Sequence, residues 1–191
     1  MKKIVSSFLA SVSMLYCVAQ TESEVRPVLD QYTQELIDGN WVKSLDYTYP
    51  GLFTVYPKEQ MQQLVVQTFS DTSMFVIGFN SMEFGNISEV YSDDEIDYSF
   101  VNYSMQMTMR FTSAIPEENY ESTLGLMRSQ FGEDKVRLEG NTLIIDQDNT
   151  MAAIKTKDEE KIYFMEIKEQ LFPIMEQFMS ADFLALAKAQ L

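Results

Sequence analysis

Apolar and polar residues alternate along residues 95–111, and this is the clearest pattern in the chain. Up to Phe100 the even-numbered residues are apolar, whereas from Val101 onward the odd-numbered residues are apolar. Alternation with a period of two is typical of a β-strand that buries one face. Because a slip of one residue would turn every later side chain to the wrong face, the change of phase predicts a β-bulge near Phe100 and Val101.

The length of this strand predicts that it bends. Seventeen extended residues at about 3.3 Å each span roughly 55 Å, whereas a compact domain of this chain length is about 40 Å across. We therefore expect a coiled strand whose apolar face is concave against a helical cover. Its polar row, which includes Glu95, Asp97 and Ser99, should face water, because a strand buried on both faces would not carry a clean polar row.

The remaining pattern places helices before and after a series of strands. Helical spacing of apolar residues predicts helices over 23–38, 40–48, 57–69, 114–130 and 169–191, and Ser180 is a candidate cap within the last of them. Further strands are predicted over 74–79, 81–90, 135–139, 142–147, 151–156 and 160–167, separated by turn residues such as Asp148-Asn149. This order predicts an α+β fold in which N-terminal helices pack on a strongly curved, mainly antiparallel sheet, with a C-terminal helix.

The N-terminal segment has the features of an export signal. Two lysines, an apolar run and a small-residue cleavage site follow one another within residues 1–19. We therefore expect a signal peptide over 1–19, a single domain over 20–191, and a secreted or periplasmic protein. A buried N-terminal helix and a lipid anchor on Cys17 are the alternatives, although Tyr16 occupies the position before Cys17 where lipidated proteins normally have a small residue.

Composition excludes several kinds of chemistry. The chain has no histidine, its one cysteine is Cys17, and its formal net charge is −15. Ser-His-Asp and Cys-His catalysis, zinc sites made of Cys and His, and His-ligated haem all require residues that the expected domain lacks. The negative charge should repel nucleic acid and anionic lipid. We therefore expect no cofactor, no metal and no nucleic-acid partner, and no transmembrane span after cleavage.

Three segments carry a resemblance to known proteins. They are DYTYPGLFTVYPKEQM at 46–61, QTFSD at 67–71 and DYSFVNYSMQMTMRF at 97–111. They resemble an uncharacterised family of secreted bacterial proteins, and the order of elements is similar to the cone-shaped, cystatin-like fold of nuclear transport factor 2 and ketosteroid isomerase. The resemblance implies a cone-shaped α+β domain. It implies no particular activity, because folds of this type carry many functions.

A cone of this kind would enclose an apolar pocket between the bent sheet and the helices. The aromatic and methionine side chains expected to line it either contact a small hydrophobic ligand or fill the core themselves. The candidate residues are Trp41, Tyr49, Phe53, Tyr98, Tyr103 and Met105. The resemblance to ketosteroid isomerase further implies a carboxylate beside a tyrosine, for which Asp46 with Tyr47 or Tyr49 is the nearest local candidate.

Two other groups of residues suggest metal binding, and each has a simpler structural interpretation. Met105, Met107 and Met109 offer soft sulfur atoms that suit Cu(I). Alternate strand residues lie roughly 6.6 Å apart, however, which favours packing in the core. Acidic clusters at 93–97, 117–121, 146–148 and 158–160 lack the ligand pattern of a helix-loop-helix calcium site, so we expect solvated turns there.

These observations favour a non-enzymatic binding or interaction module of the cell envelope. Its partner would be a protein or a small hydrophobic molecule, and a homodimer through the outer sheet face stays open. The alternative is a histidine-free enzyme or a carrier that acts on a small hydrophobic molecule in the cone pocket. An apolar cavity of a few hundred Å³ that contains a buried carboxylate and a tyrosine would favour this alternative.

Overall fold

The computed structural model describes residues 22–69, 75–93, 95–113 and 115–191. Within these residues the helices are α1 (Glu22–Ile37), α2 (Trp41–Ser44), α3 (Leu52–Val55), α4 (Lys58–Phe69), α5 (Tyr120–Phe131), α6 (Phe172–Met175) and α7 (Ala181–Lys188), with short 3₁₀ turns η1 (Leu45–Tyr47), η2 (Glu117–Asn119) and η3 (Glu169–Leu171). The strands are β1 (Phe75–Ile87), β2 (Tyr91–Ser92), β3 (Ile96–Phe111), β4 (Val136–Glu139), β5 (Thr142–Thr156) and β6 (Ile162–Ile167). The predicted signal peptide lies outside the described residues.

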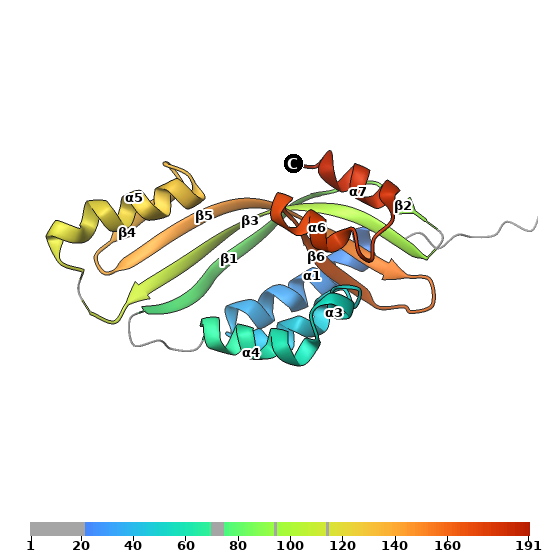
Figure 1. The fold of residues 1–191 in the computed structure, drawn as a ribbon, viewed down its shortest axis with the longest axis horizontal. Coiled ribbons are helices and arrows are strands. Elements are labelled where there is room, and N and C mark those ends of the chain that lie inside the picture. The colour runs from blue at the N-terminus through green and yellow to red at the C-terminus, as the bar shows by residue number, and fades with distance from the viewer. Residues whose placement is uncertain (1–21, 70–74, 94, 114) are drawn as a thin grey trace, which may run out of the picture.

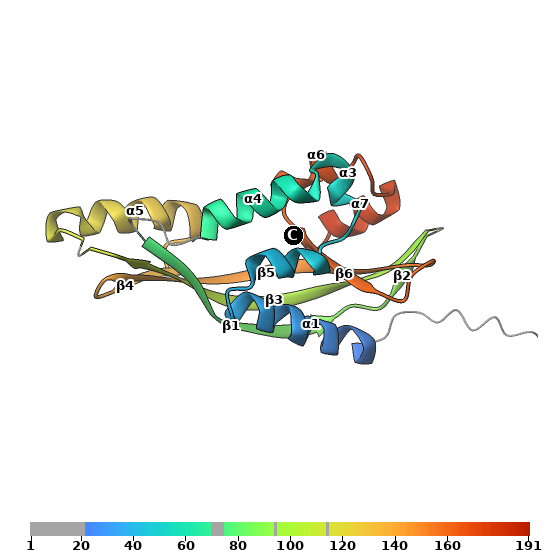
Figure 2. The ribbon, with the colours of Figure 1, turned by 90° about the horizontal axis from the view of Figure 1, so that it is seen from below.

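All six strands form one antiparallel sheet built on the long pair β3 and β5. These two strands pair continuously from Ile96–Thr156 to Arg110–Thr142. β1 and β4 flank one end of the pair, and β2 and β6 flank the other end. The sheet curves along its length and does not close into a barrel, with helices over both ends (Figures 1 and 2). The predicted α+β fold with a strongly curved antiparallel sheet is therefore confirmed.

The predicted β-bulge in β3 is wrong. The register between β3 and β5 is constant across Phe100 and Val101, so side chains keep alternating there without a slip. The phase of burial changes because the helices that bury β3 change face: Phe100 packs against α7, and Val101 packs against α1. The two register shifts of the sheet lie in the pairing of β1 with β3, at 79–81 and at 84–87 of β1.

The expectation of one solvated sheet face holds only for half of the sheet. Near β2 and β6 both faces are covered, with α6 and α7 on one face and α1 on the other. Asp97 and Ser99, which were expected to face water, are 7% and 0% exposed. The Asp97 carboxylate accepts a hydrogen bond from the Ser92 hydroxyl, so a local partner replaces part of its hydration.

Beyond this doubly covered half, only one face of the long strands is buried. The apolar side chains of Met107 and Met109 pack with Leu124 of α5. On the opposite face Asn102, Ser104 and Arg110 are exposed. α5 and α1 both contact the odd-numbered residues of β3, yet they lie on opposite sides of the sheet in Figure 1, because the long strands twist.

Two local predictions near the C-terminal half have different outcomes. β5 runs straight through Asp148-Asn149, where a turn was predicted, because both residues pair with β3 in the same register as their neighbours. Ser180, by contrast, caps α7 as the sequence predicts: its hydroxyl accepts a hydrogen bond from the Phe183 amide, at 3.2 Å.

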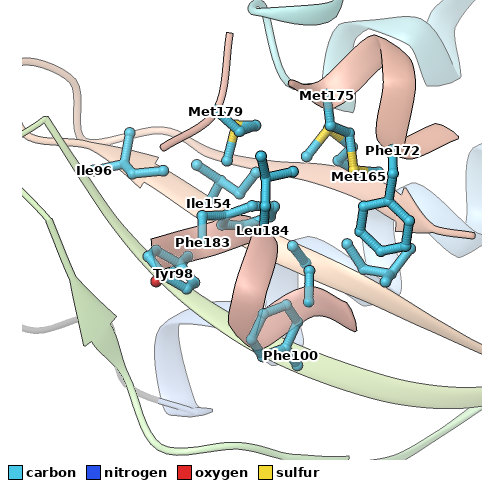
Figure 3. Packing of buried hydrophobic residues seen from close by; sticks show 13 residues of the cluster. Ile96, Tyr98, Phe100, Ile154, Met165, Phe172, Met175, Met179, Phe183 and Leu184 are labelled. Atoms are coloured by element: carbon cyan, nitrogen blue, oxygen red, sulfur yellow. The ribbon is translucent and has the colours of Figure 1, made fainter. Parts of the chain in front are cut away.

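The largest cluster of the core lies between the sheet and α7 (Figure 3). Phe183 is 0% exposed and contacts the rings of Tyr98 and Phe100, with centroids 4.8 and 5.9 Å away. These contacts join a helix near the C-terminus to the middle of the chain. Among the described residues no helix has both the length and the apolar character to span a membrane.

Replacing Phe183 with alanine should strongly destabilise the fold. The change removes a fully buried ring and leaves a cavity, which typically costs about 3–5 kcal/mol. Leu126→Ala is the matched control, because Leu126 is 65% exposed on α5 and should change stability by no more than about 0.5 kcal/mol. Urea unfolding followed by circular dichroism measures both values, and equal losses for the two variants would contradict this account of the core.

Candidate functional site

A cavity of about 250 Å³ lies along the outer edge of β6. Its walls come from α1, η1, α3, α4, β5, β6 and the α6 region, so both helical layers contribute to it. Most lining side chains are apolar, among them Leu52, Met61, Phe164, Met165, Ile174 and Met175. Tyr32, Tyr47 and Thr48 add hydroxyl groups, and Glu166 is the only charged residue among the described residues that line the cavity.

The chain before α3 explains why a cavity forms at this edge. Thr48 makes a parallel bridge with Phe164, and the Tyr49 amide donates a hydrogen bond to the Phe164 carbonyl at 3.0 Å. Gly51 then lets the chain turn closely: a Cβ at this position would lie 2.5 Å from the Tyr49 ring and 2.7 Å from the Phe178 ring. With the chain held against β6 in this way, α3 contacts α6 and closes the space beside the strand.

Glu166 is the charged residue of the cavity lining, and Tyr103, which does not line the cavity, holds its carboxyl group. Glu166 lies opposite Met151 of β5, and Tyr103 lies opposite Asn149 of the same strand. The Tyr103 hydroxyl donates a hydrogen bond to Glu166 Oε1. Glu166 Oε2 is buried and accepts no hydrogen bond, although the whole side chain is 31% exposed.

Burial changes the pKa of the Glu166 carboxyl group. It raises the pKa of Glu166 above its ordinary value, while the nearby Lys168 and the hydrogen bond from Tyr103 act in the opposite direction. Lys168 Nζ lies 3.7 Å from Glu166 Oε2. Burial, followed by the charge of Glu166, also raises the pKa values of Tyr32 and Tyr103. Both phenols therefore keep their protons at neutral pH, and Tyr103 donates its proton in the hydrogen bond to Glu166.

None of the six residues predicted to line a pocket lines this cavity. Trp41 stacks on Phe69, with ring centroids 4.6 Å apart, and Lys58 lies over the ring of Phe53 at 5.5 Å. Tyr49 packs against Phe178, which does line the cavity.

The other three predicted residues lie on two faces of the sheet. Tyr98 belongs to the core under α7, whereas Tyr103 and Met105 belong to the core under α1. Of the six, Tyr103 has the direct polar link to the cavity, through Glu166. The structure therefore does not bring the six together, and their role in binding stays a prediction.

The structure favours a different carboxylate from the one that the resemblance implied. Asp46 is exposed and pairs with Lys58 at 2.6 Å, which lowers the pKa of Asp46. Glu166 is instead the carboxyl group beside tyrosines in an apolar surrounding. A signal for it exists in the sequence, because Glu166 falls in phase with Ile162 and Phe164 on one face of β6. A charged residue that continues an apolar row is a candidate functional residue.

The methionines and the acidic residue Asp93, which suggested metal binding in the sequence, have structural roles. Met105 packs with the core under α1, while Met107 and Met109 pack with the core under α5. Asp93 accepts hydrogen bonds from the amides of Glu95 and Ile96, as expected of a turn. In the part of the chain that the structure describes, no three Cys, Asp or Glu residues form a group suited to a metal ion.

Replacing Glu166 with glutamine should change how stability depends on pH. Because the folded-state pKa of Glu166 lies above its ordinary value of 4.5, the folded chain holds this proton more tightly than the unfolded chain does. The resulting stabilisation is present below about pH 4.5 and is lost as the pH rises through the raised pKa. We therefore expect the unfolding free energy of wild type, relative to E166Q, to fall as the pH rises from about 4.5 through the raised pKa and to stay constant above it.

Urea unfolding of both proteins over the same pH series measures this difference, and the contributions of the other carboxylates cancel in it. A difference that rises with pH would contradict the raised pKa.

Comparison with known proteins adds no relative to this description. No family model, no curated protein and no solved structure matches the chain. The proposals below therefore rest on the geometry of the chain itself.

Proposed function

We propose that the protein is a non-enzymatic carrier that binds a small, mostly apolar molecule in the cavity along β6. The supporting observation is the cavity itself, with a volume of about 250 Å³ and a largely apolar lining. Binding sites for small molecules typically combine apolar walls with a few placed polar groups. Here Glu166 and the hydroxyl groups of Tyr32, Tyr47 and Thr48 are the polar groups of the lining, and they would orient a bound molecule.

The volume limits the size of the ligand. An engineered apolar cavity of about 150 Å³ holds one benzene molecule. By proportion, 250 Å³ accommodates about ten non-hydrogen atoms. Drug-sized ligands usually occupy about 300–1,000 Å³, so the proposed ligand is smaller than a sterol or a flavin. This size favours a single aromatic ring with a short substituent, or a short branched chain.

This proposal combines the two functions that the sequence suggests: a non-enzymatic binding module, and a carrier for a small hydrophobic molecule. An apolar cavity with a buried carboxyl group and a tyrosine is the feature expected of a carrier or an enzyme for a small hydrophobic molecule. Residues 1–19 lie outside the described part of the chain, so export to the cell envelope stays a prediction that the proposal does not need.

Proton transfer on the bound molecule is a second candidate function. Burial raises the pKa of Glu166, which makes its carboxylate a stronger base, and Tyr103 donates a hydrogen bond to it. Exchange of a carbon-bound hydrogen of the ligand with deuterated water would be the sign of this function. We place binding first because the volume and lining of the cavity support it without any reaction.

Filling the cavity should weaken the binding of a small apolar molecule. In Ile174→Trp a larger side chain replaces one that lines the cavity, so the affinity for a small apolar probe such as butylbenzene should fall at least about tenfold, or 1.4 kcal/mol. Leu126→Trp is the matched control, because this exposed residue lies on α5, away from the cavity. Isothermal titration calorimetry of the full chain measures the affinities.

One probe molecule should bind per wild-type chain. Equal affinity in Ile174→Trp and wild type would show that the probe binds elsewhere.

A further inference from the structure

We infer that the molecule bound along β6 is aromatic, and that its ring lies between aromatic side chains on two walls of the cavity. This inference rests on the proposed function and names the chemical class of the ligand. The volume alone suits either an aromatic ring or a short branched chain. The positions of the aromatic side chains around the cavity decide between these two classes.

One wall carries the rings of Tyr32 and Tyr47. These two residues belong to α1 and η1 and pack with the core under α1. Their ring centroids lie 5.8 Å apart, with the ring planes tilted by 52°. Both residues line the cavity and are only half-buried, so they keep accessible surface that a ligand can contact.

The other wall carries Phe178. This residue follows α6 and packs with the core under α7, on the opposite face of the sheet from α1. Its ring packs against Tyr49, with centroids 6.1 Å apart. Like the two tyrosines, Phe178 lines the cavity and is half-buried. A flat ring in the cavity therefore has aromatic neighbours from both helical layers.

Aromatic neighbours favour an aromatic ligand over a saturated one. The face of an aromatic ring carries partial negative charge and its edge partial positive charge, so rings attract one another edge-to-face or in offset stacks, beyond the gain from burying apolar area. A saturated ring lacks this charge distribution. Met61 also lines the cavity and is half-buried. It acts in the same direction, because a thioether sulfur makes favourable contacts with aromatic rings.

Two probes of matched structure test the class of the ligand. Phenylethanol and cyclohexylethanol each have nine non-hydrogen atoms, within the roughly ten that the cavity accommodates. Their hydroxyl groups are the same, so the contribution of this group cancels. Burial of apolar area alone favours cyclohexylethanol, whose saturated ring has the larger apolar surface. We expect the reverse: phenylethanol should bind the full chain at least about threefold more tightly, as measured by isothermal titration calorimetry.

Substitution of Phe178 tests whether the aromatic walls cause this preference. Phe178→Leu removes one ring and keeps an apolar side chain, so the preference for phenylethanol should fall at least about twofold while cyclohexylethanol still binds. Phe69→Leu is the matched control: Phe69 is also half-buried, but it stacks on Trp41 and does not line the cavity. This control should keep the preference of wild type.

The outcomes distinguish this inference from the proposed function. If wild type binds the two probes equally, or prefers cyclohexylethanol, the inference is overturned and the proposed function stands. If wild type binds neither probe, both are overturned. A preference that persists in Phe178→Leu, or that falls as much in Phe69→Leu, would overturn the role of Phe178. The wild-type ranking requires no substitution, so it decides the ligand class even if Phe178→Leu fails to fold.

Discussion

The continuous pairing of β3 with β5 determines the arrangement of the rest of the molecule. Because the register stays constant from Ile96–Thr156 to Arg110–Thr142, the position of a residue in the alternation decides which face its side chain occupies. Helices then cover different faces at different points along the strands. The same ladder extends through β6 and sets Glu166 and Tyr103 on one face, with β5 between them. A phenol is long enough to reach across that strand, and the hydrogen bond results.

The sequence predicts much of the fold because local patterns determine individual elements. The α+β class, the curved antiparallel sheet and the cap at Ser180 follow from alternation, helical spacing and capping chemistry. The bulge at Phe100 was predicted wrongly because alternation reports which residues are buried, but not which layer buries them. Two layers on opposite faces of one strand produce the same pattern as one layer and a slip. Asp97 was predicted to face water because alternation does not show that a second layer covers its face. In the structure Asp97 is buried, and the Ser92 hydroxyl donates a hydrogen bond to its carboxylate.

The candidate site was harder to predict because its residues come from many parts of the chain. Tyr32, Met61, Glu166 and Ile174 lie on four different elements and meet only after the helices pack around the edge of β6. The sequence search favoured large aromatic residues, and most of these fill the cores instead. Tyr103 was predicted as a candidate, but its partner Glu166 was not, because an acidic residue in a short strand is normally interpreted as a surface residue. The apolar phase shared by Ile162 and Phe164 was the available signal.

The irregular pairing of β1 with β3 has a consequence for association between molecules. β1 is an outer strand of the sheet, and an outer strand with a flat row of unpaired amide and carbonyl groups is a template for another chain. The shifts at 79–81 and 84–87 interrupt that row in two places. At the opposite border β4 is only four residues long. Both borders are thus poorly suited to edge-to-edge aggregation, which gives this long open sheet a built-in protection against fibril growth.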